Sequence, residues 1–466
     1  MDSLVRHVKV GLLPLYLKLY DDTSPASRRE VQRFRDTISD ELSRRGLRVM
    51  TAPVCRVRSE IDTAVQGFEV GEVEAIVTLH LAYSPSEESL PALATTALPI
   101  IVLDTTPAFD FSPTQSPDAV MYNHGIHGVQ DLCNLLLRHG KAFQLEAGHW
   151  EHSDVLDRVV QAAQSVHLAN AMRSARIGRI GRPFQGMGDF AVNDERLART
   201  LGVIVIPATP AEIGARLSGI SQEDVDTEWE DDVRRFDVAG VSKTQYGPTA
   251  HVCLAVRQWM EQEHLTGFTV NFMEANRAAG LPTMPFLEAS KAMARGVGYA
   301  GEGDCLTAAL VGALASVFEQ VSFTEMFCPD WAHDTIFLSH MGEMNVAMVA
   351  GRARLIHKPY SFIDIDDPVL AVGRFDSGLA TLVNLAPGPS DTFTLIIAPV
   401  TIQEVVDADA HVDSIRGWIK PGGALPSFLA HYSRLGGTHH SALIKGDVVR
   451  IVKGFGELMS WKVEVI

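Results

Sequence analysis

Short apolar runs alternate with longer amphipathic stretches through roughly the first two thirds of the chain. Residues 28–45 are charged, with the spacing of a helix. Strands are predicted for the apolar runs at 7–15, 48–54, 74–81 and 99–104. Because apolar strands that alternate with helices form parallel sheets covered on both faces, we expect a doubly wound α/β domain at the start of the chain.

Polar side chains come at or just after the ends of several of these predicted strands. They are Tyr16, His80, Tyr83 and Asp104. Ligands of open parallel sheets bind beyond the carboxyl ends of the strands, so we expect these side chains near one edge of the sheet. No Gly-x-Gly-x-x-Gly follows the first run, which argues against a dinucleotide-binding domain.

A glycine-rich segment, Asn123–Gly128, opens a predicted helix at Val129–Arg138. Its two histidines, His124 and His127, suit polar contacts with a ligand. A capping turn with solvent-exposed histidines is the simpler explanation of this segment taken alone.

The pattern then begins again. A long predicted helix at 153–175 and a strand at Arg176–Ile180 place a domain boundary near residue 172. Further strand-like runs at 202–206 and 267–272 alternate with helices, which predicts a second α/β domain. The strongly acidic segment 222–235 is expected to be the solvated face of a helix and not a metal site.

After about residue 330 the chain changes to short strands at close spacing, which is typical of an antiparallel barrel or sandwich. The strand-like runs are 335–339, 345–349, 353–357, 369–373, 380–385, 393–402, 441–444, 448–453 and 460–466. The predicted fold is therefore α/β: two doubly wound α/β domains, at 1–172 and 173–328, followed by a mostly antiparallel, barrel-like β domain at 329–466.

Length and composition agree with this division. At roughly 150 residues per domain, a chain of 466 residues predicts about three domains. The formal net charge of −17 argues against nucleic acid or an anionic membrane as a partner. The five cysteines are scattered without a Cys-x-x-Cys pair, and no apolar run reaches the ~20 residues of a membrane span. We expect a cytoplasmic protein with reduced thiols and no secretion signal.

The segment Gly301-Glu302-Gly303-Asp304 precedes an apolar stretch with helical spacing. The glycines allow a tight turn, and the partial positive charge at a helix start favours an ionised carboxylate. Such a carboxylate can hold a hard cation or move a proton. A helix start with acidic capping residues explains the segment equally well.

Three further segments carry side chains that could join Glu302 in a metal site. They contain Glu325, His340 and the pair His439-His440. Two carboxylates with two imidazoles suit Mn²⁺, Co²⁺ or Fe²⁺ better than Ca²⁺. The separations are too large to form a self-evident motif. Taken singly, His340 fits a buried core histidine and His439-His440 a polar hairpin turn.

The four segments together resemble the L-arabinose isomerase family, within the broader arabinose/fucose isomerase group. The matching stretches occur in family order and at near-family spacing: Gly298–Asp304, Ser322–Glu325, Ser339–Glu343 and Gly436–His440. The resemblance implies that Glu302, Glu325, His340 and His440 bind the metal, with Mn²⁺ or another divalent ion such as Co²⁺ as cofactor.

The resemblance also extends to the substrate pocket. It implies substrate contacts for His127, Tyr83, Met187, Thr269, Phe272 and His439. In the family the first domain closes the pocket of a neighbouring subunit, which implies a homo-oligomer, hexameric or trimer-based, with shared active sites. The chain departs from the family in its first loop, Leu12–Leu17, where the family has a glutamine, and at Cys305-Leu306, where the family has Trp-Lys.

The implied reaction is aldose–ketose isomerisation of a pentose such as L-arabinose through a cis-enediol, with Glu302 and Glu325 as the acid/base pair. Two alternatives stay open at this point. One is a metal-dependent epimerase or lyase that acts on a sugar acid or polyol, with Lys18 or Arg182 as the partner of a substrate carboxylate. The other is a non-catalytic cytoplasmic sugar-binding protein.

Overall fold

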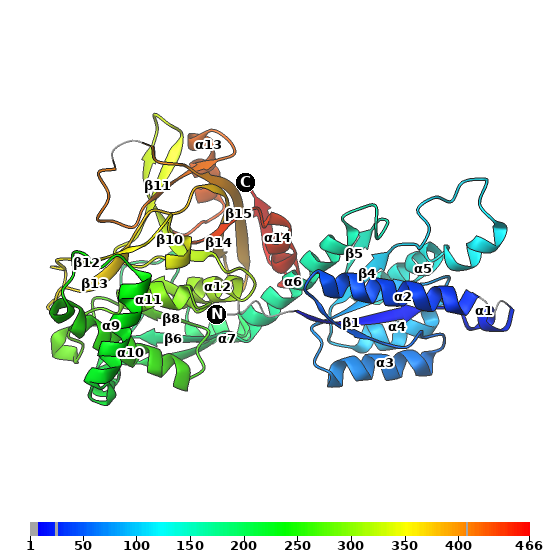
Figure 1. The fold of residues 1–466 in the computed structure, drawn as a ribbon, viewed down its shortest axis with the longest axis horizontal. Helices are drawn as coiled ribbons and strands as arrows, with labels where there is room; N and C mark the ends of the chain where they lie inside the picture. Colours follow the sequence, from blue (N-terminus) through cyan, green and yellow to red (C-terminus); the bar gives the residue numbers. More distant parts are fainter. Residues whose placement is uncertain (1–7, 24–26, 407–408) are drawn as a thin grey trace. The chain divides into compact units, whose positions relative to one another are not determined.

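The computed structural model describes residues 8–23, 27–406 and 409–466. The chain divides into two compact units, the first ending at His167 and the second beginning at Leu168 (Figure 1). No helix within the described residues is long and apolar enough to cross a membrane.

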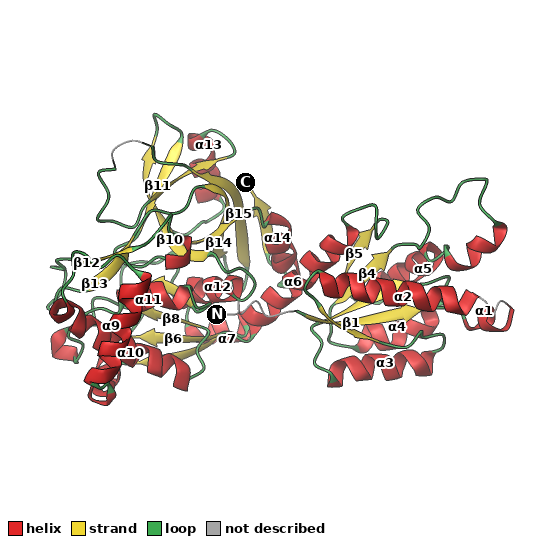
Figure 2. Cartoon of the chain, viewed as in Figure 1, coloured by secondary structure: helices red, strands yellow, loops and turns green. Residues whose placement is uncertain are grey.

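The first unit contains a five-stranded parallel sheet in the order β2-β1-β3-β4-β5. Its strands are β1 (Lys9–Leu15), β2 (Arg48–Thr51), β3 (Ala75–His80), β4 (Ile100–Asp104) and β5 (Phe143–Ala147). Every residue of β3 is buried, because helices cover both faces of the sheet (Figure 2). This confirms the predicted doubly wound sheet and its first four strands.

The helices of this unit are α1 (Lys18–Thr23), α2 (Ser27–Arg44), α3 (Arg58–Val70), α4 (Ser86–Thr95) and α5 (Ile126–Arg138), with a short η1 (Pro117–Tyr122). Buried residues of α3, α4 and α5 share one apolar core with β1, β3 and β4. The helix α6 (Val155–Arg173) begins in the first unit and ends in the second.

The second unit opens with a four-stranded parallel sheet in the order β7-β6-β8-β9. The strands are β6 (Arg176–Ile180), β7 (Ile204–Ala208), β8 (Gly267–Val270) and β9 (Gly298–Gly301). The helices around it are α7 (Asp194–Leu201), α8 (Pro210–Arg216), α9 (Gln222–Arg235), α10 (Lys243–Gln262), α11 (Phe286–Met293) and α12 (Cys305–Ala315), with η2 (Leu217–Gly219) and η3 (Arg277–Ala279).

The helix α12 packs tightly on this sheet. Gly298 makes the approach possible, because a Cβ there would lie 2.2 Å from the carbonyl oxygen of Ala308. Every residue of α12 from Cys305 to Leu314 is buried. The turn between β9 and α12, which carries Glu302, is therefore fixed at both ends.

The rest of the second unit is a seven-stranded, mostly antiparallel sheet in the order β14-β17-β10-β11-β16-β15-β18, and a pairing of β14 with β15 closes it into a barrel. Its strands are β10 (Val321–Asp330), β11 (Thr335–Ser339), β14 (Gly378–Pro387), β15 (Phe393–Ile402), β16 (Gly417–Pro421), β17 (His440–Lys445) and β18 (Lys462–Val465). Strands β12 (Arg354–His357) and β13 (Val369–Val372) form a separate ribbon, and α13 (Leu425–Arg434) and α14 (Val449–Leu458) complete the unit. The predicted barrel-like β region is confirmed.

Two strand predictions in this region are wrong. Residues 345–349 contain a 3-10 helix, η4 (Val346–Met348), because the Asn345 side chain caps it by accepting a hydrogen bond from the Ala347 amide. Residues 448–453 begin α14, despite their β-branched side chains. The buried residues Ile451, Val452 and Phe455 have helical spacing and belong to one core with β15, so tertiary packing outweighs local propensity.

The acidic segment is a helix, α9, but it is not entirely solvated. Glu228 is 8% exposed and Asp232 is fully buried, which contradicts the expectation for these two residues. They are four residues apart and therefore lie on one face of the helix. One apolar core runs from α6 to α14 through both sheets of the second unit. The division of this unit at residue 328 stays a prediction.

Candidate metal centre and active site

The turn after β9 has an unusual backbone. Glu302 has φ of 56° and Gly303 has φ of 81°, so both lie in the left-handed region, which costs energy for a glutamate. A Cβ on Gly303 would lie 2.9 Å from Cα of Pro183. Asp304 then caps α12 by accepting a hydrogen bond from the Thr307 amide. The tight turn and the acidic cap predicted for this segment are both present.

Strand register brings the remaining candidate ligands together. Glu325 on β10 lies opposite His440 on β17 and opposite Ser339 on β11. His340 directly follows Ser339. Three neighbouring strands of the barrel therefore present a carboxylate and two imidazoles side by side, although they are far apart in the sequence.

Glu325, His340 and His440 converge on one point with Glu302. His440 Nε2 lies 2.7 Å from Glu302 Oε2 and 3.1 Å from Glu325 Oε1. His340 Nε2 lies 3.3 Å from Glu325 Oε1 and 3.9 Å from Glu302 Oε1. Ligand atoms of Glu302, Glu325, His439 and His440 also all lie within 4.8 Å of one another. The structure thus offers three imidazoles for two carboxylates.

Each of the two inner histidines is oriented by a second, buried carboxylate. His440 Nδ1 lies 2.8 Å from Asp304 Oδ2, and His340 Nδ1 lies 2.6 Å from Glu343 Oε2. These bonds leave Nε2 of each ring directed at Glu302 and Glu325, an arrangement found around metal-binding histidines. His439 differs, since its Nδ1 and its backbone amide both bond to Asp189, and both side chains are 38% exposed.

The glutamates and the histidines of the centre shift each other's pKa values. Burial alone raises the pKa of Glu302, but the hydrogen bond from His440 and the charges of both histidines outweigh burial and lower it. Burial lowers the pKa of His340, but Glu343 and Glu325 raise it to about 10. Protons on the imidazoles therefore balance the carboxylates, and a divalent cation placed among them would compete with those protons.

Aromatic rings surround this centre. Phe190 stacks on His440, with ring centroids 4.6 Å apart and planes at 9°. Phe323 meets both His340 and His440 edge to face, at 4.8 and 5.0 Å. A cavity beside Glu302 is lined by Phe272, Phe286, Tyr299, Met341 and Tyr360. The centre is therefore screened from bulk water on several sides.

Of the predicted substrate contacts in the second unit, one lines the cavity, one supports the turn that carries Glu302, and one lies in a loop. Phe272 lines the cavity beside Glu302. Thr269 is fully buried, and its hydroxyl bonds to the Gly301 carbonyl and the Gly303 amide, so it holds the turn that carries Glu302. Met187 is half-buried in the loop that leads to Phe190. His439, also a predicted substrate contact, bonds to Asp189 as described above. Contact of these residues with a substrate stays a prediction.

The remaining two predicted contacts, Tyr83 and His127, belong to the first unit. Their ring centroids are 6.4 Å apart, and the Tyr83 hydroxyl lies 3.4 Å from Asp131. His124 joins this group, with its ring 5.8 Å from His127 and its Nε2 2.9 Å from the Tyr20 hydroxyl. Of the side chains expected at this edge of the sheet, His80 ends β3 opposite Leu15, which precedes Tyr16, and Asp104 ends β4, which pairs with β3. Tyr83 follows β3 by three residues, so all four come at or just after the carboxyl ends of adjacent strands, as expected.

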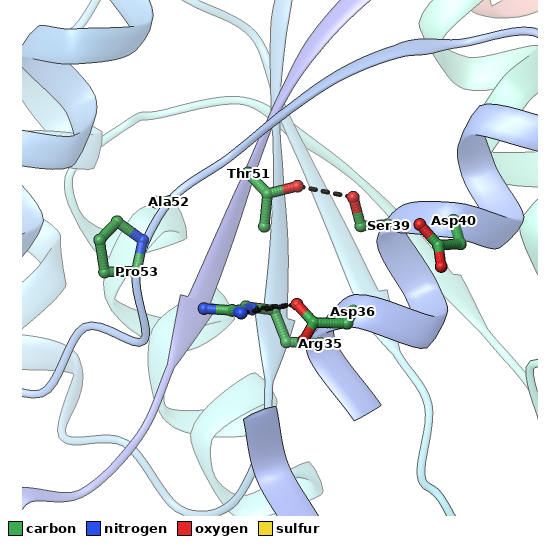
Figure 3. Close-up of a pocket in the computed structure, with 7 residues that line it drawn as sticks. All are labelled: Arg35, Asp36, Ser39, Asp40, Thr51, Ala52 and Pro53. Atoms are coloured by element: carbon green, nitrogen blue, oxygen red, sulfur yellow. Dashed lines mark hydrogen bonds and ion pairs between the residues drawn. The ribbon is translucent and has the colours of Figure 1, made fainter. Parts of the chain in front are cut away.

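The first unit also has an open hollow of about 380 Å³ between α2 and the edge strand β2 (Figure 3). Four of its five polar side chains bond in pairs: Arg35 with Asp36, and Ser39 with Thr51 at 2.6 Å. The hollow therefore offers no converging set of free polar groups comparable to the histidine–glutamate centre.

Sequence reasoning overlooked the residues that orient the histidines. Both Asp304 and Glu343 are within the matched motifs. Glu343 lies only three residues from His340, whereas Asp304 and His440 are separated by 136 residues, so no local pattern assigns Asp304 to His440. Asp189 and Phe190, which contact His439 and His440, carried no signal beyond the neighbouring glycines.

Comparison with known proteins agrees with this geometry. The family model of the L-arabinose isomerase central domain matches residues 187–320, and that of the C-terminal domain matches residues 320–462. The chain is 24% identical to an L-arabinose isomerase of Nocardioides sp. over 415 residues, which cover 85% of this chain and 81% of the relative. It is 23% identical to an L-arabinose isomerase of Geobacillus thermodenitrificans over 459 residues, which cover 94% and 90%.

A similar match joins the chain to an L-arabinose isomerase of Herpetosiphon aurantiacus, with 24% identity over 86% of this chain and 82% of the relative. The two family models adjoin at residue 320, and between them they include all four converging side chains. The chain belongs to the L-arabinose isomerase family of sugar isomerases.

Proposed function

We propose that the protein is a metal-dependent aldose–ketose isomerase that acts on a pentose or a related sugar, such as L-arabinose, through a cis-enediol. Membership of a sugar isomerase family supports the reaction class. We propose Glu302, Glu325, His340 and His440 as the ligands of Mn²⁺ or another divalent ion such as Co²⁺.

The convergence of two carboxylates and two Nε2 atoms is the observation that carries this proposal. Among the described residues, no lysine or arginine side chain contacts Glu302 or Glu325, so the centre lacks a permanent cation. A mixed oxygen–nitrogen donor set of this kind fits Mn²⁺ and Co²⁺. His340 and His440 are favoured over His439 because buried carboxylates fix their rings.

The reaction moves a proton between C2 and C1 of the sugar and shifts the carbonyl group. A divalent ion bound at this centre supplies Lewis-acid stabilisation of the negative charge that develops on the oxygens. One glutamate takes the proton from one carbon and returns it to the neighbouring carbon, while the second moves the hydroxyl proton between the oxygens. Protons balance, because each one removed is restored within the same sugar.

The residues around the glutamates support this role. Phe190, Phe323 and the aromatic side chains of the cavity exclude water, which strengthens the electrostatic interactions of the two carboxylates. The strained turn holds the Glu302 carboxylate in place before the substrate arrives.

The contacts of Arg182 favour a neutral sugar over a sugar acid. Its Nε lies 2.7 Å from Glu274 Oε1 and its backbone amide 3.0 Å from Oε2 of the same residue. The charge of Arg182, one of the two candidate partners of a substrate carboxylate, is therefore already paired. An epimerase or lyase that used Arg182 to bind a sugar acid would have to break this pair.

The decisive experiment strips the protein of metal, restores Mn²⁺ and tests a panel of aldoses, ketoses and sugar acids, with Glu302→Gln alongside. We expect aldose–ketose conversion that requires the metal and is lost in the variant. Conversion of a sugar acid instead would support the lyase or epimerase alternative. Full activity after rigorous metal removal would contradict the proposal.

We further propose that the protein is a cytoplasmic homo-oligomer, hexameric or trimer-based, in which Tyr83 and His127 serve the site of a neighbouring subunit. All four proposed ligands belong to the second unit, which supports a separate task for the first. The test mixes His127→Ala with Glu302→Gln subunits after dissociation. Partial recovery of activity on reassociation supports shared sites, whereas no recovery, with reassociation verified by size, contradicts them.

A further inference from the structure

A chain of three hydrogen-bonded side chains leads away from the metal centre. His340 Nδ1 bonds to Glu343 Oε2 at 2.6 Å, and the Tyr299 hydroxyl donates to Glu343 Oε1, also at 2.6 Å. All three side chains are buried, with Tyr299 and Glu343 each 1% exposed. Tyr299 is on β9, three residues before Glu302.

The carboxylate of Glu343 is held at both of its oxygens. Oε2 accepts hydrogen bonds from His340 and from the Gly342 amide at 2.8 Å. Within the described chain, the hydroxyl of Tyr299 is the donor to Oε1. Without that hydroxyl, Oε1 would be a buried acceptor with no partner, and the carboxylate would rotate to satisfy it.

The two histidines of the centre are supported differently. Asp304, which orients His440, caps α12 and is therefore fixed by the helix itself. Glu343, which orients His340, belongs to a segment without regular structure after β11. A carboxylate on such a segment needs an anchor on a rigid element to hold an imidazole in one orientation.

Tyr299 is well placed to be that anchor. Its strand, β9, pairs with β8, where Phe268 lies opposite Tyr299. The Tyr299 ring meets Phe268 edge to face at 5.0 Å and Phe323 at 5.8 Å. The position of the hydroxyl is therefore determined by packing and leaves little freedom to the carboxylate it contacts.

We propose that Tyr299 is a positioning residue of the isomerase. Its hydroxyl holds Glu343, and Glu343 holds the His340 ring with Nε2 facing the glutamates. This inference rests on the proposed function of the centre. Outer partners of metal-binding histidines typically contribute about 10- to 100-fold to metal affinity. Loss of the Tyr299 hydroxyl should therefore lower the affinity for the ion without removing a ligand.

The test is the affinity of the metal-stripped protein for Mn²⁺, measured by electron paramagnetic resonance of the free ion. We expect Tyr299→Phe to weaken binding about 10-fold. The matched control is Tyr246→Phe, because the Tyr246 hydroxyl also donates at 2.6 Å to a buried carboxylate, that of Asp232, away from the centre. The control should lose a comparable bond and keep the affinity of the native protein.

A double-mutant cycle shows whether Tyr299 acts through Glu343. Glu343→Gln should weaken Mn²⁺ binding on its own, and adding Tyr299→Phe to it should cause little further loss. Equal Mn²⁺ affinity for Tyr299→Phe and the native protein, or additive losses in the double variant, would overturn the inference. If Tyr299→Phe does not fold, undiminished affinity in Glu343→Gln overturns it as well. Failure of the native protein to bind Mn²⁺ would instead refute the proposed function.

Discussion

The second unit contains two buried clusters of carboxylates that differ in what neutralises them. In the candidate metal centre, called the metal centre below, Glu302 and Glu325 face two histidines. In the second cluster, which we call the ion cluster, α9, α10 and α11 bring together Glu228, Asp232, Glu288, Arg257 and Lys291. Most side chains of both clusters are buried, although Arg257 is 21% exposed and Glu325 13% exposed.

Lysine and arginine side chains, which carry permanent positive charges, neutralise the carboxylates of the ion cluster. Lys291 Nζ lies 2.7 Å from Asp232 and also contacts Glu228, while Arg257 bonds to Glu228 and Glu288. Burial raises the pKa of Glu228, but Arg257 and Lys291 outweigh burial and lower it to about 2. The donors of the two basic side chains are engaged by carboxylates within the cluster.

The metal centre is neutralised by imidazoles, which can give up their protons. The comparison shows that buried acidic residues alone do not identify a functional site. A cluster paired with lysine and arginine stabilises the fold only while it is complete, whereas one paired with histidine can exchange protons for a metal ion. Four predictions follow from this contrast, in order of decreasing effect.

The largest effect is expected for the two glutamates proposed as the acid/base pair. Glu325→Gln should lower kcat by about 10²- to 10⁴-fold at saturating Mn²⁺, the range for loss of a general acid or base. Glu288→Gln, the same change in the ion cluster, should leave kcat unchanged. Steady-state kinetics of folded protein decides this, and similar losses in both variants would remove the distinction between the clusters.

The next effect concerns stability. Lys291→Met leaves Glu228 and Asp232 without their shared cation and should lower the free energy of unfolding by about 3–5 kcal/mol. Lys243→Met is the surface control, since the Lys243–Asp226 pair is largely exposed, and it should cost less than about 1 kcal/mol. Urea unfolding measures both, and an equal loss would mean that burial of the cluster is unimportant.

Mn²⁺ should stabilise the folded protein by binding at the metal centre and not at the ion cluster. At a free Mn²⁺ concentration 100 times the Kd, the native protein should gain about 2.7 kcal/mol in unfolding free energy. The His440→Asn variant should lose this gain. The Lys291→Met variant should be less stable than the native protein without metal but should show the same gain with Mn²⁺. Thermal unfolding with and without Mn²⁺ tests the prediction, and a gain retained in His440→Asn would contradict the assigned ligands.

The smallest and most specific effect depends on pH in the metal-free protein. His340 has a folded pKa raised to about 10, so its contribution to stability is complete below its unfolded pKa of roughly 6.5 and is lost as pH rises through about 10. The loss of unfolding free energy caused by His340→Gln should therefore become smaller between pH 6 and pH 10. The cost of Glu228→Gln should stay constant, since the lowered pKa of Glu228 lies well below this range.

Much of this protein could be predicted from the chain alone. The alternation of apolar runs and helical patterns gave the parallel sheets, and the change after residue 330 gave the barrel. The four candidate ligands were found in short motifs matched in family order. Each motif consists of residues adjacent in the sequence, so it can be recognised without the fold. Such features depend on neighbours in the sequence, which a linear pattern records.

Tertiary structure alone decided how those residues meet. The register of β10 with β17 places Glu325 opposite His440, and packing of α9 on its neighbours buries Asp232. It also turns 448–453 into a helix and gives His340 and His440 their orienting carboxylates. Apart from the His340–Glu343 bond, which joins residues three positions apart, these outcomes depend on contacts between residues more than a hundred positions apart or on packing between whole elements. The energy of such contacts does not appear in any local pattern of the sequence.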